Sequence, residues 1–239
     1  MDVEGYRRLI GDAPIKLYPG FDSHGEGGTG RLVPAKKWRE AWFRGLAYGY
    51  YRRGADGIHI FNWHGTVSSH RPLLTTIGSP KTLEGVDKVY SSLKRLERPK
   101  SEPRYGAERD DRLAGEVPVK LYRTLTGTGP TFHLAVHDDR PPGSVAFELH
   151  VELDHFSPAD RVRVVLDGRD LPEPQITNTA AVDAGNPSDV TESSWLVWKL
   201  EPAMAAKGVH ALEIVLIERD ERIKSQIAVL NVEIWAKHA

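Results

Sequence analysis

Apolar and polar residues follow two different periods along the chain. Between residues 34 and 53, large apolar side chains recur four positions apart and form one broad stripe along a helix. Pro34 suits the first turn of this helix, and Gly54 suits its C-terminal cap. The pattern therefore predicts a helix over 34–53. The stripe consists of Trp38, Trp42, Leu46 and Tyr50, with Phe43 and Ala47 beside it.

Short apolar runs on both sides of this helix predict strands. The run at 15–19 follows a short helix at 6–10, and the run at 58–63 follows the long helix. A further helix is predicted over 79–96, with apolar residues on its inner side. Strands that alternate with helices indicate parallel pairing and right-handed crossovers. Two parallel strands alone do not make a self-sufficient core.

The second half of the chain has period two, which is typical of half-buried strands. About seven short strands within one domain favour an antiparallel β-sandwich. Asp167-Gly168 is a hairpin-turn signal that follows the strand at 161–166 and leads to Leu171. The predicted strands are 119–125, 131–137, 145–153, 161–166, 195–200, 209–218 and 227–235.

Aromatic and imidazole side chains in this half are candidates for ligand contact. Trp195 and Trp198 lie three apart in one strand, so they face opposite sides of the sheet. One should be a core residue, and the other should be a platform for a ligand or an interface. His150 and His155 could touch a ligand, or they are solvent-facing strand positions.

Charge and composition narrow the classes of partner. The chain has 239 residues, with 32 basic and 33 acidic side chains and a formal net charge of −1. A nearly neutral chain has no overall field that attracts nucleic acid or an anionic membrane, so neither partner is expected. No apolar run approaches the roughly 18 residues of a membrane span. The absence of cysteine excludes disulfides, thiolate metal sites and a cysteine nucleophile.

Three segments together resemble a known family. They are Ile15-Lys16-Leu17-Tyr18-Pro19-Gly20-Phe21-Asp22, the helix over 38–51, and Arg53-Gly54-Ala55-Asp56-Gly57-Ile58-His59-Ile60-Phe61-Asn62-Trp63. This part of the chain resembles the last quarter of the (β/α)8 barrel in bacterial glycoside-hydrolase-like proteins. The resemblance implies that 15–19 is the seventh strand, 58–63 the eighth strand and 81–96 the eighth helix. The strand pairs at 164–171 and 208–213 are similar to those of galactose-binding-like jelly rolls.

The expected fold class is therefore α/β plus all-β. An incomplete (β/α)8-barrel segment, made of the last two strand–helix units, is joined to an antiparallel jelly-roll-like β-sandwich. We expect the barrel portion at 1–98, a linker at 99–117 and the sandwich at 118–239. A complete barrel needs about 200 to 250 residues. The other strands would come from a preceding part of a longer chain, from another polypeptide or from a second copy.

The chemistry of such barrels lies at the C-terminal ends of the strands, here Gly20 to Glu26 and Asn62 to Thr66. Glycoside hydrolysis usually needs two carboxyl groups. The resemblance implies that Asp22 is the nucleophile, although the family pattern has glutamate at such a position, and that the acid/base lies in the missing part. Alternatively, Asp22 is an Asx-turn residue before Ser23.

The same strand ends carry candidate substrate-binding residues. Trp63 would form a platform for a sugar ring, or it packs under the loop. Asn62 would bind a sugar hydroxyl, or it caps the strand end. His24, His64 and His70 would form a cluster around an anionic or metal ligand, or they are surface histidines in loops. Glu26 is the second carboxylate. The segment from Gly25 to Gly30 lacks the ending of a phosphate loop and is predicted to be a flexible active-site loop. No cofactor or metal is expected.

Two functions follow from these observations. The first is the C-terminal part of a glycoside-hydrolase-like protein that acts on or binds carbohydrate and is inactive alone. The alternative is a non-catalytic carbohydrate-binding or structural β-sandwich module. If the intact protein is a glycosidase, an extracellular or periplasmic location is expected, with any signal peptide on the missing part.

Overall fold

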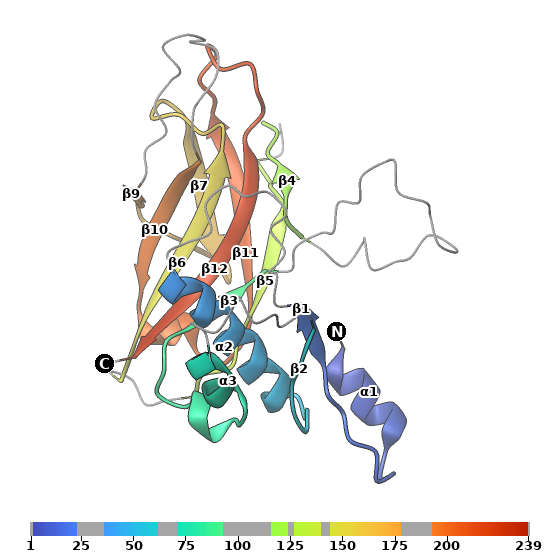
Figure 1. The fold of residues 1–239 in the computed structure, drawn as a ribbon. Coiled ribbons are helices and arrows are strands. Elements are labelled where there is room, and N and C mark those ends of the chain that lie inside the picture. Colours follow the sequence, from blue (N-terminus) through green and yellow to red (C-terminus); the bar gives the residue numbers. More distant parts are fainter. Residues whose placement is uncertain are drawn as a thin grey trace. The chain divides into compact units, whose positions relative to one another are not determined.

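The computed structural model (Figure 1) describes seven stretches of the chain, and at positions 21–22, 36–39 and 61 it describes the backbone alone. The chain divides into two compact units. An α/β unit comprises 1–90, 137–145 and 236–239, and a sandwich unit comprises 91–136 and 146–235. The predicted boundary at residue 98 lies outside the described residues, so that division of the chain stays a prediction. The described stretches are 2–22, 36–61, 71–92, 116–123, 127–139, 144–177 and 193–238.

The α/β unit contains a parallel strand pair joined by a helix. Strands β1 and β2 pair in parallel, with Gly20 opposite His59 and Asp22 opposite Phe61. The predicted parallel order and the predicted long helix are confirmed. The elements are α1 (Val3–Ile10), β1 (Gly20–Asp22), α2 (Lys36–Arg52), β2 (His59–Phe61), α3 (Arg71–Ile77), a 3₁₀ turn (Lys81–Leu83) and β3 (Lys88–Ser91).

Strand β1 begins after the predicted strand at 15–19, and this prediction was wrong in its position. The amide and the carbonyl of Leu17 both bond to Asp56, which lies in the turn before β2. Pro19 has no N–H to donate, and its carbonyl accepts from the His59 amide at 3.0 Å. The segment at 15–19 is therefore tied to a turn, and the ladder begins only at Gly20.

The predicted helix over 79–96 was also wrong. A 3₁₀ turn replaces its start, Gly85 adopts φ +73°, and strand β3 follows. A left-handed glycine ends a helix, and the β-branched Val86 and Val89 favour the strand. Helix α2 packs directly on this strand, because a Cβ at Gly45 would lie 2.0 Å from the Val89 carbonyl oxygen.

Helix α2 buries residues on two sides. On one side, Tyr50 packs with Val3 and Leu17. On the other side, Ala47 and Tyr48 pack with residues of α3 and the 3₁₀ turn. The described part of the α/β unit therefore holds two small apolar clusters beside α2.

The sandwich unit is built from antiparallel sheets, as predicted. One sheet has the order β5-β11-β7-β8, and the other has β3-β12-β6-β10-β9, with β4 on β12. All seven predicted strands are present within the described residues, and β3, β8 and β9 are not among those seven. The strands not yet named are β4 (Val119–Lys120), β5 (Thr131–Val136), β6 (Val145–Asp154), β7 (Arg161–Leu166), β8 (Arg169–Asp170), β9 (Gln175–Thr177), β10 (Ser194–Leu200), β11 (Gly208–Glu218) and β12 (Ala228–His238).

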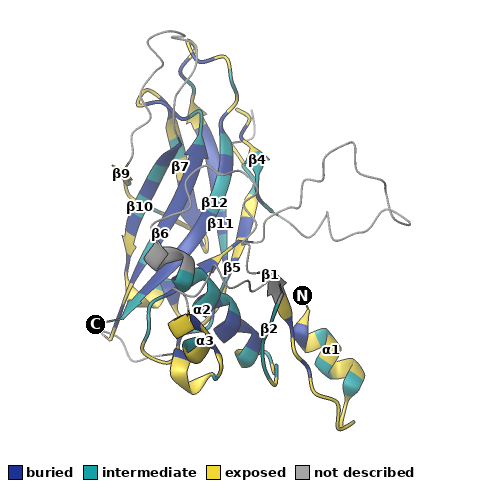
Figure 2. Ribbon diagram, in the orientation of Figure 1, coloured by how far each residue is buried: buried dark blue, intermediate teal, exposed yellow. Residues whose placement is uncertain are grey.

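Burial alternates along β5 and β10, whereas β6 and β12 carry longer runs of buried residues (Figure 2). In β5 the apolar residues Phe132, Leu134 and Val136 are buried, while Thr131 and His133 are exposed. The hairpin signal is confirmed, since Asp167 and Gly168 have φ +49° and +77° between β7 and β8. These sheets make the protein a β-rich α/β chain. Within the described residues, no helix is long and apolar enough to cross a membrane.

Candidate functional site

The C-terminal ends of β1 and β2 form the first candidate site. Because the two strands are parallel and in register, they end together at Asp22 and Phe61. Asp22 therefore lies at the strand edge where (β/α) barrels carry their chemistry, and its catalytic role stays a prediction. The other predicted site residues lie outside the described part of the chain. These are His24, Glu26, Asn62, Trp63, His64 and His70.

The turn between α2 and β2 is held by one carboxylate. Asp56 accepts hydrogen bonds from the Leu17 amide at 2.9 Å, from Lys16 Nζ at 3.2 Å and from the Arg7 guanidinium. The Leu17 amide, and then Arg7, lower the pKa of Asp56 to about 2. Arg7 Nε also donates to the Gly54 carbonyl at 2.8 Å. Asp56 therefore joins α1, the segment before β1 and the turn before β2.

The glycines of this turn are required by geometry. Gly54 adopts φ +100°, a conformation that favours glycine. A Cβ at Gly57 would lie 2.5 Å from a ring carbon of Tyr18. The Gly-Ala-Asp-Gly-Ile segment, which carries much of the family resemblance, thus has a structural role in positioning β2.

A buried charge cluster, which we call the Lys88 cluster, lies elsewhere in the α/β unit. The Lys88 side chain is 0% exposed. Its Nζ lies 3.1 Å from Asp138 Oδ1 and donates to the carbonyls of Leu83 and Val86, each at 2.9 Å. It also lies 4.9 Å from the centre of the Tyr48 ring. Such contacts compensate for the loss of hydration of a buried ammonium group.

Asp138 is the anion of this cluster. The Tyr90 hydroxyl donates to Asp138 Oδ2 at 2.8 Å, and His238 Nε2 lies 3.5 Å from Oδ1. Burial alone would raise the pKa of Asp138, but the hydrogen bond from His238 and the Lys88 charge outweigh it, so the pKa is lowered. Burial, with Asp138 adding to it, raises the pKa of Tyr90 well above 10.0. The cluster is a paired structural network, which sequence reasoning missed because its members lie far apart along the chain.

A second polar cluster, here named the sheet-face cluster, lies in the sandwich unit on one face of the six-stranded sheet. His150 stacks on Trp235, with ring centres 3.7 Å apart, and meets the Trp195 ring edge-on at 6.2 Å. His150 is only 7% exposed, so the expectation that it faces solvent was wrong. The cluster consists of Glu148, His150 and Glu152 from β6, Trp195 from β10, and Asn231, Glu233 and Trp235 from β12.

The carboxylates of the sheet-face cluster fix its rings and amides. His150 Nε2 lies 2.8 Å from Glu148 Oε2, and Trp235 Nε1 donates to Glu233 Oε2 at 2.6 Å. Glu152 accepts from Asn231 and from Ser193 Oγ. The stack beneath Trp195 is therefore held by hydrogen bonds on both rings.

The prediction that Trp195 and Trp198 face opposite sides is confirmed. Trp198 is 4% exposed, and its Nε1 donates to the Pro172 carbonyl at 2.7 Å. Trp195 lies on the other face and is half-buried. His155, the other histidine considered, adopts φ +54° at the end of β6, and its carbonyl accepts from Arg219.

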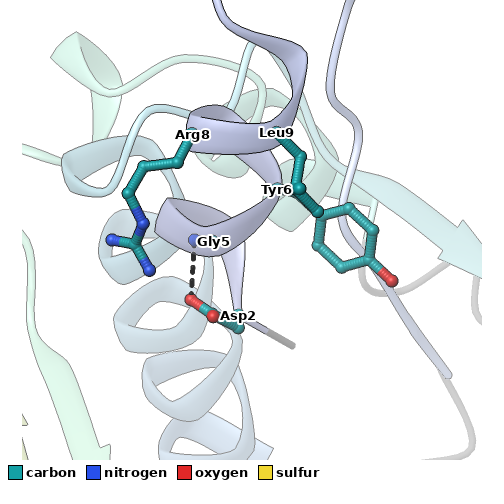
Figure 3. Close-up of a pocket in the computed structure, with 5 residues that line it drawn as sticks. All are labelled: Asp2, Gly5, Tyr6, Arg8 and Leu9. Carbon is teal, nitrogen blue, oxygen red and sulfur yellow. Dashed lines mark hydrogen bonds between the residues drawn. The ribbon is translucent and has the colours of Figure 1, made fainter.

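One further place in the described chain, a hollow on α1, does not form a site. A surface hollow on α1, lined by Asp2, Gly5, Tyr6, Arg8 and Leu9, comes from a single helix end (Figure 3). Its one internal bond is the helix cap from the Gly5 amide to Asp2 Oδ1 at 2.9 Å. Among the described residues, no group of three or more His, Asp or Glu side chains is placed to hold a metal ion.

Comparison with known proteins adds no family. No protein-family model matches the chain, and no curated protein matches it.

Proposed function

We propose that the chain is the C-terminal part of a glycoside-hydrolase-like protein that acts on or binds carbohydrate and is inactive by itself. The observation that supports this function is the parallel β1–α2–β2 unit, with Asp22 at the C-terminal end of β1. Parallel strands joined by a helix are the repeating unit of (β/α)8 barrels, whose catalytic residues lie at that end of the strands. The substrate class itself rests on the resemblance of the sequence.

The size of the α/β unit supports the need for additional strands. Strands β1 and β2 have three residues each, and the buried residues of the described unit form two small clusters beside α2. A two-stranded sheet of this length does not stabilise a domain. Further strands would come from a preceding part of the chain, from another polypeptide or from a second copy. A jelly-roll-like sandwich would follow this barrel.

The proposed reaction uses two carboxyl groups. In a retaining mechanism, Asp22 attacks the anomeric carbon while an acid on the missing part protonates the leaving oxygen. Water then cleaves the glycosyl–aspartate ester, and the same acid, now a base, takes the proton of that water. Trp63, Asn62, His24, His64 and Glu26 are proposed to hold the sugar.

The test begins with the reading frame upstream of the Met1 codon. A frame that encodes additional strand–helix pairs would allow the intact protein to be produced and assayed for release of sugar from polysaccharides. Asp22→Asn should abolish turnover and leave the fold unchanged. Asp12→Asn, at an exposed position of the same unit, is the matched control. Normal turnover by Asp22→Asn would remove Asp22 from the mechanism.

A non-catalytic function is the second candidate, and a specific observation favours it. The sandwich unit has two antiparallel sheets with a buried interior, so it has the architecture of an independent module. In this case the protein binds carbohydrate, or supports a barrel, without cleaving a bond. Sugar binding without turnover in the intact protein would favour this candidate over the hydrolase.

A further inference from the structure

We propose that the face of strands β10 and β9 that carries Trp195, beside β6, binds an uncharged polysaccharide chain, with Trp195 as the platform on which a sugar ring stacks. This inference rests on the proposed carbohydrate function and gives it a location in the sandwich unit. It also gives a role to Trp195, a residue outside the proposed reaction.

The register of the strands defines this face. Trp195 lies opposite Thr177 on β9, and Val197 lies opposite Gln175. Residues opposite each other in a ladder share a face, and so do alternate residues of one strand. Trp195, Val197 and Lys199 therefore form a row along β10, beside Gln175 and Thr177. Gln175, Thr177 and Lys199 are exposed, and Trp195 and Val197 are half-buried.

The Trp195 ring is held in place before any ligand arrives. His150 contacts it edge-on, with an angle of 69° between the rings. His150 is itself stacked on Trp235 and bonded to Glu148. An aromatic side chain fixed in this way loses little conformational entropy when a ligand binds.

The groups around Trp195 match the two surfaces of a sugar. The apolar C–H face of a pyranose ring can stack on an indole. The exposed amide of Gln175 and the hydroxyl of Thr177 offer donors and acceptors for the hydroxyls at the edge of the ring. A row along a strand suits an extended chain of sugars with equatorial hydroxyls, as in β-1,4-linked polymers.

The charges on this face select against acidic polymers. Glu148 and Glu152 lie opposite Lys199 and Trp195, respectively, and Glu233 belongs to the same cluster. Lys199 is the cation of the described row. Glu148 is half-buried, and Glu152 and Glu233 are buried, so these carboxylates act on a bound polymer through the field of the cluster rather than by direct contact. Like charges brought together are unfavourable, so this field disfavours a polymer of uronic acids. An uncharged chain meets no such repulsion.

The experiment measures binding of the full 239-residue chain to hydroxyethyl cellulose and to polygalacturonate, by affinity electrophoresis and calorimetry. The wild-type chain should bind the neutral polymer and not the acidic one. Trp195→Ala should weaken binding about tenfold or more, as truncation of an aromatic anchor does. Gln175→Ala should weaken it less. Tyr122→Ala removes an aromatic ring that is 58% exposed outside these three strands, and it should bind like the wild type.

Each other result overturns a defined claim. Unchanged binding by Trp195→Ala would reject this face and leave the carbohydrate function standing. Equal binding of both polymers would reject selection by charge. No binding of the neutral polymer at millimolar sugar would reject the face, whereas Asp22 is tested separately by turnover of the intact protein. If circular dichroism shows that Trp195→Ala is unfolded, two other variants test the face. Trp195→Phe should retain binding, and Gln175→Ala should weaken it.

Discussion

The buried interiors of the two units are stabilised in different ways. The α/β unit has two three-residue strands and two small apolar clusters, and it also buries the Lys88–Asp138 ion pair. The sandwich unit has strands of up to eleven residues, and its longest strands carry runs of three and five consecutive buried residues. Its sheet-face cluster brings several polar side chains together on one face of a sheet. In the α/β unit, specific polar contacts hold together segments that its small sheet does not connect. In the sandwich unit, apolar packing holds most of the strands together.

This difference bears on function. On β9 and β10, the exposed side chains of Gln175, Thr177 and Lys199 can change at small cost to the fold. The turn around Asp56 and the Lys88 cluster have no such freedom, because each joins segments distant in sequence. Substitutions can therefore separate residues that hold the fold from residues available to bind a ligand.

The largest expected effect comes from breaking the buried ion pair. Lys88→Met removes the cation and leaves the Asp138 carboxylate buried, which should cost about 3–5 kcal/mol. Hydrogen exchange should report the loss in the α/β unit first, and urea denaturation should give its size. Addition of Asp138→Asn should restore part of the stability. Arg163→Met is the control, since the side chains of Arg163 and its partner Asp170 are 48% and 65% exposed, and its loss should cost at most about 1 kcal/mol.

The next largest loss of stability is expected from a cavity in the sandwich unit. Leu149 on β6 is 0% exposed, and Leu149→Ala should destabilise the protein by about 2–5 kcal/mol through lost burial and an unfilled cavity. Urea denaturation measures this loss. Leu149→Met nearly conserves volume, so it should cost less than about 1.5 kcal/mol. Equal losses for the two variants would contradict tight packing around this residue.

Contact between α2 and β3 gives a smaller expected effect. In Gly45→Ala, the new methyl group would meet the Val89 carbonyl, and overpacking of this kind costs about 1–3 kcal/mol. The gain in helix propensity, about 1 kcal/mol, offsets part of this cost. Thermal unfolding should therefore show a net loss. An increase in stability would mean that the helix and the strand separate easily.

Periodicity predicted the elements whose partners lie close in sequence or follow a regular alternation. It placed α2, the parallel order of β1 and β2, and the seven strands of the sandwich. It failed at 79–96, because Leu83, Val86 and Val89 also fit a helical spacing and nothing local marks Lys88 as buried. It placed Trp195 and Trp198 on opposite faces, since alternation depends on one strand alone. Periodicity could not predict that His150 is buried, because Trp235, on which the His150 ring stacks, comes from another strand.

The smallest expected effect concerns pH and the turn that positions β2. The folded-state pKa of Asp56 is about 2, against an ordinary value of 3.8 for an aspartate side chain. A lowered carboxyl pKa adds stability that is fully present above the unfolded pKa and is lost as the pH falls through the folded value. Asp56→Asn should therefore lower the stability of the α/β unit by a constant amount above about pH 4, and this difference should shrink between pH 4 and pH 2. Urea denaturation or hydrogen exchange across this range measures it. Arg7→Met removes one of the groups that lower this pKa, so it should move the loss to higher pH. A difference that stays constant down to pH 2 would mean that Asp56 holds the turn by shape rather than by charge.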